Sequence, residues 1–504
     1  MVKRLALAVA GGFASSLAMP REDLWPLIFV SVAALSLSVR GLKAWSALFV
    51  GFAGGLAFYL SQIEWLTLYL GPVPWLALST LEAIIFALGL LALSVVWRWL
   101  DARDFGRFGS LIIAAALASI WTAREWVSIT LPYGGFPWSR LAQTQSNSYL
   151  SKWVFVGGLG WLTFVIAFVS IAALLLLLNR ETKIAKAALG ASIVLFLIGP
   201  LAINPSAAAE AGSYRIAAVQ GNANAGLFAN TKRGEVLQNH IDATAEMLKD
   251  SKSQDLDVLV WPENASDLSP FSDAKTYQDI QNLVNDEYHV PFIFGTITAR
   301  GDNLYNSSIL WTPGLGPTDW YDKKRPVPFA EYVPDRDFWY QLAPDLIGLV
   351  SRGYTFGERD GIFEIGAVKL GALICFEIAI DDISRDLVQQ GAQVILSQTN
   401  NADFGRSDET FQQAAFAKLR AIETGRSVVN ISTVGVSAIY GADGSTLASL
   451  PTFESGYMIQ DVPLRTSLTP AIVIGRYVDL AINLIALALI LLATLPAARK
   501  RREA

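Results

Sequence analysis

The chain has 504 residues, of which 53% are hydrophobic and only 16% are charged. Its mean hydropathy of +0.39 is too high for an ordinary soluble protein, so much of the chain must face lipid. The formal net charge of -5 provides no basic field for nucleic acid, and that class of partner is disfavoured. One cysteine and two histidines exclude an intrachain disulfide and are too few for a zinc site built from these residues. We expect neither a metal nor a cofactor.

The apolar sequence falls into eight stretches, each a candidate helix for a bilayer core of about 30 Å. They cover residues 5–19, 24–39, 44–70, 73–100, 108–127, 154–178, 187–203 and 470–495. Between the seventh and the eighth lies a segment with the charge density of a soluble domain. We therefore predict a transmembrane bundle over 1–210, a folded polar domain over 211–465, and a last span with a basic tail over 466–504.

Lysine and arginine in the short loops all fall on one side of the membrane if the spans alternate. These residues are Lys3, Arg4, Arg40, Lys43, Arg98, Arg103, Arg107, Arg180, Lys183, Lys186 and the cluster at 499–502. The positive-inside rule makes that side the cytoplasm. A multi-pass protein of the cell membrane is then expected, with both termini inside and the polar domain outside. A cleaved signal peptide over the first twenty residues is an alternative that leaves every later loop in place.

From Tyr214 the pattern alternates between strands and helices, which predicts an α/β layer structure. Strands are expected at 215–219, 257–261, 291–298, 307–311, 368–375, 393–397 and 427–431, with helices at 235–248 and 409–424. Polar residues just after buried strands are natural catalytic positions, because the carboxyl ends of the strands open into a crevice.

Three segments of this domain carry reactive groups at such positions. Glu263 follows the buried run VLVWP, and Cys375 follows the run ALI. Between them, a proline-rich loop over 321–331 carries Lys323 within a cation cluster, together with a second carboxylate. A thiol is a useful nucleophile only as the thiolate, so some group must take its proton.

Histidine is the usual base for a thiol, but neither histidine stands after a strand. His240 lies on a predicted helix and His289 in a loop before a strand. A carboxylate can take the proton if burial raises its pKa, and a nearby ammonium can stabilise both the thiolate and a later oxyanion. Glu263, Lys323 and Cys375 provide that set.

Three motifs at these residues, WPEN, YDKKRPVPFAEYVP and ICFE, resemble the nitrilase superfamily, whose members carry a Glu, Lys, Cys triad on an αββα sandwich. Their order between seven spans and one is similar to the membrane-bound family of that superfamily, the apolipoprotein N-acyltransferases. The resemblance covers most of the chain. Asn306 and the segments 220–222 and 135–138 are also similar to family segments.

The resemblance implies a role for each member of the triad. Glu263 would be the general base, Lys323 the cation that stabilises the oxyanion, and Cys375 the nucleophile that carries the acyl chain. Lys323 is preferred to Lys324 because the family lysine stands two residues after the Tyr and eight before the Glu of this loop.

Further positions around the triad match the family less completely. Glu331 and Glu377 correspond to acidic positions that help to hold the site, and Asn306 supports it. Phe376 stands where the family usually has tyrosine, so a hydrogen bond from that hydroxyl is absent. This difference affects the positioning of the nucleophile rather than its identity.

The implied reaction has two halves, and both substrates are lipids. A phospholipid would donate an acyl chain to Cys375 as a thioester, and the lysophospholipid would leave. The free α-amino group of a diacylglyceryl-cysteine lipoprotein would then accept the chain, because a thioester is easily aminolysed.

Several simpler interpretations stay open at the level of sequence. A cysteine at a strand end is often a small buried hydrophobe, Glu263 could cap the surface, and the cations at 323–325 could contact lipid headgroups. A tethered amidase for a small soluble amide would need one anchor helix rather than eight spans. A transporter with a polar binding module would be expected to show internal repeats, and none is visible; an inactive scaffold would leave the triad unexplained.

Ionisable residues in or near the predicted spans are costly unless they are paired. They are Glu64, Glu82, Arg124 and Glu125. We expect interhelical pairs or contacts with lipid. Phe404 and Phe411 are interpreted as interfacial anchors.

Overall fold

The computed structural model describes residues 1–178, 183–226, 229, 232–350 and 353–495. Arg180 and the basic cluster at 499–502 therefore lie outside the described residues. The chain divides into two compact units. One comprises Met1–Glu64, Val73–Ile203 and the C-terminal helix from Ile474 onward; the other comprises Trp65–Pro72 and Asn204–Val473.

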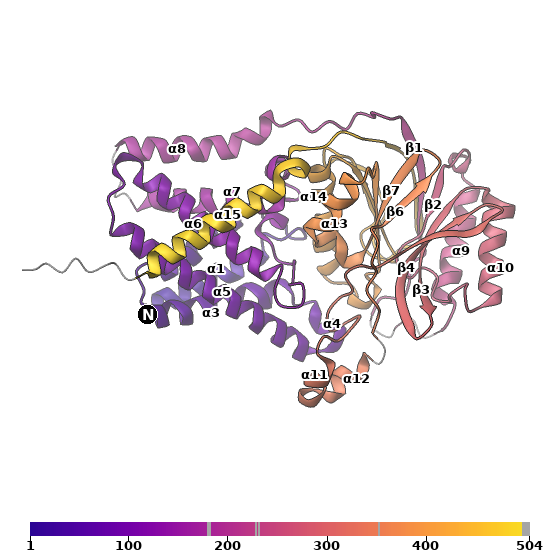
Figure 1. Cartoon of the computed structure of the whole chain (residues 1–504), viewed down its shortest axis with the longest axis horizontal. Coiled ribbons are helices and arrows are strands. Elements are labelled where there is room, and N and C mark those ends of the chain that lie inside the picture. Colours follow the sequence, from indigo (N-terminus) through magenta and orange to yellow (C-terminus); the bar gives the residue numbers. More distant parts are fainter. Residues whose placement is uncertain (179–182, 227–228, 230–231, 351–352, 496–504) are drawn as a thin grey trace, which may run out of the picture. The chain divides into compact units, whose positions relative to one another are not determined.

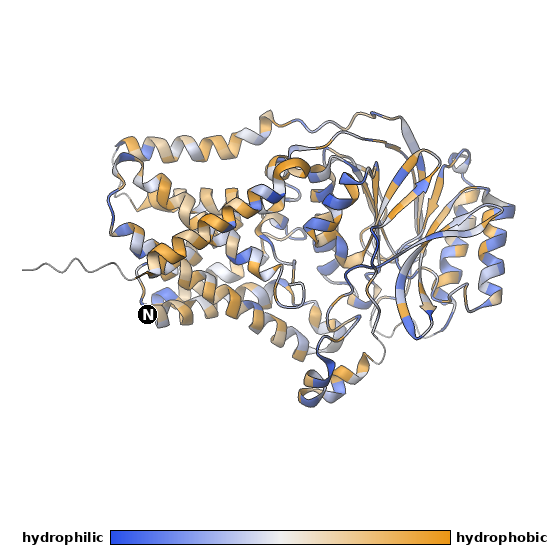
Figure 2. Ribbon diagram, viewed as in Figure 1, coloured by the Kyte–Doolittle hydropathy of each residue, from blue (hydrophilic) through white to orange (hydrophobic). Residues whose placement is uncertain are grey.

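Helices make up the first unit, and Figure 2 shows that most of their residues are hydrophobic. In chain order they are α1 (Val2–Ser16), α2 (Leu27–Val39), α3 (Ala44–Gln62), α5 (Pro72–Asp101), α6 (Gly109–Ser128), α7 (Val154–Leu177), α8 (Lys183–Ile198) and α15 (Pro470–Thr494). Long runs of Leu, Ile, Val, Ala and Phe favour helix here because an α-helix satisfies all of its backbone hydrogen bonds within the segment.

Six helical segments among the described residues are long and apolar enough to cross a membrane. They are Ala44–Gln62, Pro72–Asp101, Gly106–Ser128, Tyr149–Leu177, Lys183–Ala202 and Pro470–Thr494. The first two helices have 15 and 13 residues, fewer than the roughly 20 that a bilayer core requires. The polytopic helical class is confirmed, whereas the number of eight spans stays a prediction.

Buried ionisable side chains of the helical unit have partners on neighbouring segments. The bonds join Arg140 Nε to Glu125 Oε1 (3.2 Å), Arg124 Nη1 to Tyr59 OH (3.0 Å) and Ser128 Oγ to Glu82 Oε2 (2.5 Å). Such pairing removes much of the cost of placing charge among apolar helices. For Glu82 and Arg124 the contacts favour the interhelical pairing offered above, whereas Glu125 pairs with Arg140 of the loop after α6.

Two six-stranded sheets form the centre of the second unit. The first has the order β12-β1-β2-β3-β4-β5 and the second β11-β10-β9-β8-β7-β6. The strands of the first sheet are β1 (Ser213–Gln220), β2 (Val258–Val260), β3 (Phe292–Arg300), β4 (Asn303–Thr312), β5 (Gly316–Asp322) and β12 (Gly456–Pro463). Those of the second are β6 (Ile362–Ile365), β7 (Val368–Ile374), β8 (Val394–Thr399), β9 (Ser427–Ser432), β10 (Ala438–Tyr440) and β11 (Thr446–Ser449).

The central strands of each sheet run parallel, as β1, β2 and β3 do in one and β7, β8 and β9 in the other. Residues that follow β2, β7 and β8 therefore emerge at carboxyl ends, where side chains can project from the sheet. The remaining strands pair antiparallel and extend each sheet outward.

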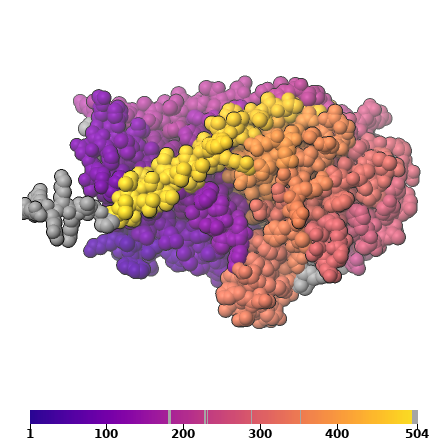
Figure 3. Space-filling model, in the orientation of Figure 1, coloured from indigo at the N-terminus to yellow at the C-terminus, as the bar shows by residue number. Residues whose placement is uncertain are grey.

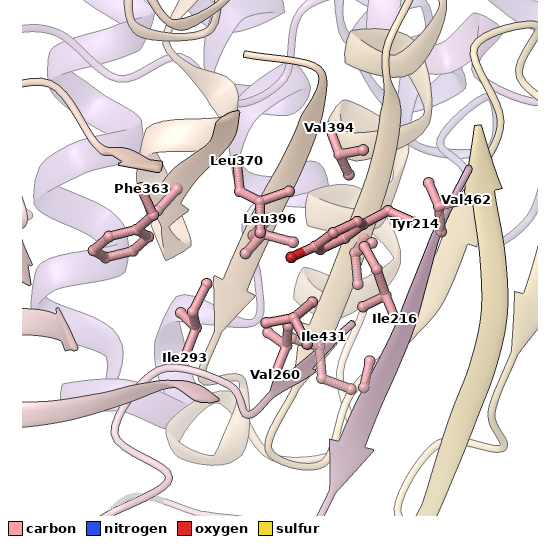
Figure 4. Packing of buried hydrophobic residues seen from close by; sticks show 14 of the residues in the cluster. Tyr214, Ile216, Val260, Ile293, Phe363, Leu370, Val394, Leu396, Ile431 and Val462 are labelled. Carbon is pink, nitrogen blue, oxygen red and sulfur yellow. The ribbon is translucent and has the colours of Figure 1, made fainter. Parts of the chain in front are cut away.

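The core lies between the sheets, and helices cover the outer faces. Figure 4 shows Ile216 and Val260 of the first sheet near Leu396 and Ile431 of the second, within one buried cluster. A second cluster joins the first sheet to α9 (Glu235–Leu248) and α10 (Ala274–Asn282), which lie on its outer side in Figure 1. Helices α13 (Asp381–Gln389) and α14 (Glu409–Thr424) accompany the second sheet. The α/β layer structure predicted from the residue pattern is confirmed, and its αββα form is the one that the resemblance implied.

Candidate active site

The only cysteine of the chain stands on a strained turn at the end of β7. Cys375 has a backbone φ of 54°, a left-handed conformation that side-chain-bearing residues rarely adopt. It opens a short 3₁₀ segment, Cys375–Ala379, and the residue is half-buried while both neighbours are buried. Conformations of this kind cost about 1–3 kcal/mol and persist only where the surroundings hold them. The turn over 374–377, called the cysteine turn below, thus places Cys375 just beyond the end of β7.

Glu377 holds the cysteine turn against the loop that follows β5. Its carboxylate accepts from the backbone N–H of Ile374 (2.9 Å), Lys324 (2.7 Å) and Arg325 (3.1 Å) and from the hydroxyl of Tyr321 (2.9 Å). Burial raises the pKa of this fully buried carboxyl, and the donors oppose that rise. One side chain therefore fixes two segments that are far apart in sequence.

A buried cation lies between two carboxylates beside this turn. The Nζ atom of Lys323 is 3.3 Å from Glu263 Oε1 and 2.9 Å from Glu331 Oε2, and its side chain is 1% exposed. Asn306 Nδ2 donates to both carboxylates, at 2.7 Å to Glu263 and 2.9 Å to Glu331. The four side chains form one hydrogen-bonded cluster, so each limits the rotamers of the others.

Two glycines allow the backbone to place this cluster. A Cβ atom at Gly295 would lie 2.6 Å from Glu263 Cα, and one at Gly357 would lie 1.9 Å from Asp322 O. The N–H of Gly357 donates to Lys323 O at 2.8 Å. Any side chain at either position would push the segment that carries Glu263 or Lys323 out of place.

Burial and charge set the protonation states of the three reactive groups. Burial raises the pKa of the Cys375 thiol well above its ordinary value, Glu263 raises it further, and Lys323 opposes the rise. Burial also raises the pKa of the Glu263 carboxyl. For Lys323, burial disfavours the charged form, but Glu263 and Glu331 hold its pKa well above the usual value. The resting site therefore combines a neutral thiol, a charged ammonium and a carboxyl group whose proton affinity is enhanced.

Lys324 and Phe376 lie beside this cluster with different contacts. The Nζ atom of Lys324 is 2.5 Å from Asp360 Oδ1, so it has a different partner from Lys323. Phe376 is buried and offers no hydroxyl. Among the described residues, no group of three or more His, Cys, Asp and Glu side chains is arranged to hold a metal ion.

Comparison with known proteins identifies the family. Residues 11–172 match the model of the apolipoprotein N-acyltransferase N-terminal domain, and residues 215–468 match that of carbon-nitrogen hydrolases. The apolipoprotein N-acyltransferase of Mycolicibacterium smegmatis is 30% identical, over 97% of this chain and 85% of the relative. The chain belongs to the apolipoprotein N-acyltransferase family. The resemblance predicted from the motifs is confirmed.

Other family members align over similar lengths. The apolipoprotein N-acyltransferase of Pseudomonas aeruginosa is 29% identical, over 92% of this chain and 91% of the relative. That of Shewanella oneidensis is 26% identical, over 94% of this chain and 92% of the relative. Among solved structures, an amidase of the nitrilase superfamily from Nesterenkonia AN1 is 18% identical and covers 55% of this chain and 99% of its own, with a TM-score of 0.41.

The structure also brings to the thiol a polar side chain that the sequence did not reveal. Gln413 Nε2 lies 3.4 Å from Cys375 Sγ, and Gln413 Oε1 accepts from Asn401 Nδ2 at 2.6 Å. Asn401 Nδ2 also donates to Glu409 at 2.7 Å, and burial raises the pKa of Glu409 to about 8. Asn401 follows the buried strand β8, so the rule that located Glu263 and Cys375 could have found it. A glutamine in mid-helix gives no comparable signal.

A short segment between two predicted membrane helices belongs to the second compact unit, which contains Cys375 and is called the catalytic unit below. Helix α4 (Leu66–Leu70) lies in Trp65–Pro72, so the apolar run predicted as one span over 44–70 ends at Gln62. The rings of Trp65 and Tyr69 pack on Phe404, with centroids 5.2 and 5.7 Å apart. Burial raises the pKa of Tyr69 to about 12, with smaller contributions from the charges of Asp403 and Glu331. Phe404, which was interpreted from the sequence as an interfacial anchor, thus forms an aromatic cluster with Trp65 and Tyr69.

Proposed function

We propose that this chain is an N-acyltransferase that moves a fatty acyl chain from a phospholipid, through a thioester on Cys375, to the α-amino group of the N-terminal diacylglyceryl-cysteine of lipoproteins. The observation that carries the proposal is the placement of the only cysteine on a strained turn beside a buried carboxylate and ammonium. Full-length similarity to enzymes named apolipoprotein N-acyltransferase supports the choice of substrates.

In the first half-reaction, Cys375 Sγ attacks the carbonyl carbon of a phospholipid ester. Because the pKa of the thiol is raised, the sulfur needs a base, and Glu263 takes its proton as the C–S bond forms. The oxyanion that develops on the carbonyl oxygen is stabilised by the ammonium of Lys323. When the intermediate collapses, the ester C–O bond breaks and Glu263 returns the proton to the departing lysophospholipid oxygen.

In the second half-reaction, the neutral α-amino group of the lipoprotein attacks the thioester carbonyl. A new C–N bond forms, Glu263 takes one proton from nitrogen, and Lys323 again stabilises the oxyanion. The C–S bond then breaks and the sulfur of Cys375 regains a proton from Glu263. The products are an amide and the free thiol, so the enzyme returns to its starting state.

The neighbours of the triad support it by position. Glu331 and Asn306 hold Lys323 and Glu263 in one hydrogen-bonded cluster, which keeps the ammonium charged and aimed. Glu377 secures the cysteine turn, and Phe376 fills buried space behind it. Preorganised charges of this kind act strongly because they need not reorganise during the reaction.

Apolar surface on the catalytic unit supports a phospholipid as the donor. Helices α11 (Arg336–Leu342) and α12 (Pro344–Leu349) follow the loop that carries Lys323 and project from their unit (Figures 1 and 3). Phe338 and Leu342 are 57% and 65% exposed there. A soluble substrate would not require such exposure, whereas amphipathic surface suits the lipid interface.

We place the catalytic unit on the extracytoplasmic side of the cell membrane, because the loop lysines and arginines mark the other side as cytoplasmic. Reporter fusions within the segment 213–463 and after residue 495 test this placement. Opposite signals are expected, and the same compartment for both fusions would contradict the topology.

The acceptor is tested with purified protein in phospholipid vesicles that carry a radiolabelled acyl chain. A peptide with an N-terminal diacylglyceryl-cysteine should become labelled on its amine, and the same peptide with an acetylated amine should not. Equal labelling of the two peptides would exclude N-acyl transfer.

A further inference from the structure

A chain of hydrogen bonds runs from backbone N–H groups of the loop between β9 and β10 to the sulfur of Cys375. We infer that Gln413 is a further catalytic residue, whose side-chain amide donates a hydrogen bond to the sulfur and stabilises the thiolate whenever it forms. The inference deepens the proposed function, on which it rests for its role in acyl transfer. It concerns the state of the thiol, which is measurable without any acyl transfer.

The direction of the chain is set by a backbone donor. The N–H of Gly435 donates to Ser432 Oγ at 3.0 Å, so the hydroxyl proton of Ser432 is free to point to Asn401 Oδ1, 2.6 Å away. In the same way, the N–H of Val436 donates to Thr410 Oγ1 at 2.7 Å. The hydroxyl of Thr410 is 3.4 Å from Asn401 Oδ1. Two hydroxyl donors thus identify Oδ1 as the oxygen of the Asn401 amide.

The remaining orientations follow from this assignment. With its oxygen facing the hydroxyls, Asn401 presents Nδ2 to Glu409 Oε2 (2.7 Å) and to Gln413 Oε1 (2.6 Å). Gln413 accepts through Oε1, so its NH₂ group must face the other way, and there Nε2 lies 3.4 Å from Cys375 Sγ. Amide orientations are normally assigned from such networks. In this network, the orientation of Asn401 fixes that of Gln413, and the Gln413 NH₂ group is then the donor that faces the sulfur.

A hydrogen-bond donor at the sulfur acts in the same direction as Lys323, against the groups that raise the thiol pKa. Burial and the carboxylates of Glu263, Glu409 and Glu331 all raise the pKa of Cys375, and Lys323 lowers it. A hydrogen bond to the charged form of a group favours that form. The ammonium of Lys323 is shared between two carboxylates. The Gln413 side chain contacts Asn401 through its oxygen, so its amide N–H can donate to the sulfur.

The same contact serves both half-reactions. During acylation it stabilises negative charge on the attacking sulfur, and during aminolysis it stabilises the sulfur as it leaves. Gln413 is 1% exposed on α14, and its rotamer is limited by Asn401, so the donor needs little reorganisation at either step. A purely structural glutamine would affect folding but would not change the titration of the thiol.

The test measures the rate of alkylation of Cys375 by iodoacetamide against pH in the full-length protein, with intact-mass detection. Only the thiolate reacts, so the midpoint of the profile reports the thiol pKa. Gln413→Leu should move the midpoint upward by about one pH unit, the size of shift that one hydrogen bond to a charged group produces. Its thioester formation from phospholipid should slow about 10²-fold, with little change in KM.

Gln412→Leu is the matched control, because Gln412 is also buried on α14 but accepts from Trp65 Nε1 at 3.0 Å. Its midpoint should equal that of the wild type. Gln413→Glu keeps the shape of the side chain and provides the second variant if the leucine protein does not fold; its midpoint should rise at least as far. A wild-type midpoint in the folded Gln413 variant would overturn the inference, even if acyl transfer were slow.

Discussion

Replacing Glu377 by glutamine should loosen the cysteine turn while leaving every reactive group of the triad in the chain. Glu377 accepts from three backbone N–H groups and one hydroxyl. An amide has only one accepting oxygen, and its NH₂ group must then face at least one of those backbone donors. The less disruptive orientation sets the NH₂ against the N–H of Ile374, since the other side faces both Lys324 and Arg325.

A buried donor without an acceptor costs about 1–3 kcal/mol. For a domain of this size, 1 kcal/mol corresponds to a change in Tm of roughly 2–4 °C, so Glu377→Gln should melt several degrees below the wild type. Acylation should fall by more than the loss of stability explains, because the thiol depends on a turn that is strained without support.

Differential scanning fluorimetry in detergent and the rate of thioester formation from labelled phospholipid measure the two effects. Glu364→Gln is the control, because Glu364 lies on β6 with its side chain 63% exposed and should tolerate the same substitution. A Glu377→Gln protein with wild-type Tm and wild-type acylation would refute the role assigned to this carboxylate.

Four other substitutions probe the charges of the site. Lys323→Ala should lower acyl transfer by about 10²-fold or more, and Lys324→Ala should be mild because its ammonium pairs with a different carboxylate; equal losses would show that the wrong lysine has been assigned. Glu263→Gln should abolish acyl transfer yet lower the pH midpoint for alkylation of Cys375, since the charge of Glu263 raises the thiol pKa; an unchanged midpoint would contradict that coupling. The pKa of Glu409 is about 8 in the fold against an ordinary 4.5, so unfolding releases its proton between these values and stability falls as pH rises through that window. Glu409→Gln should therefore flatten the decline in Tm from pH 5 to pH 8, and parallel Tm profiles would count against this assignment.

The fold was predictable because two physical periodicities dominate the sequence. Long apolar runs gave helices, and short buried runs between helical segments gave the parallel strands of the sandwich. Glu263 and Cys375 could be found because both follow such strands. Lys323 was grouped with them because a thiol needs a base and a counter-charge, and it was preferred to Lys324 because of the family resemblance.

Other features depend on tertiary contacts that periodicity does not encode. The run over 44–70 is apolar throughout, and hydropathy does not distinguish side chains that face lipid from Trp65 and Tyr69, which pack on Phe404. Gln413 acts through an amide oriented by a network from three segments, so nothing in its local sequence marks it. The left-handed backbone of Cys375 is likewise imposed by its surroundings.

Intact-protein mass spectrometry of the chain purified from native membranes tests the central claim most directly, because a thioester enzyme isolated with its donor lipids should carry an acyl chain. The expected result is a fatty-acyl mass adduct that maps to Cys375, is removed by neutral hydroxylamine, and is absent from Cys375→Ser. An adduct on another residue, or acyl transfer by Cys375→Ser at the wild-type rate, would contradict it.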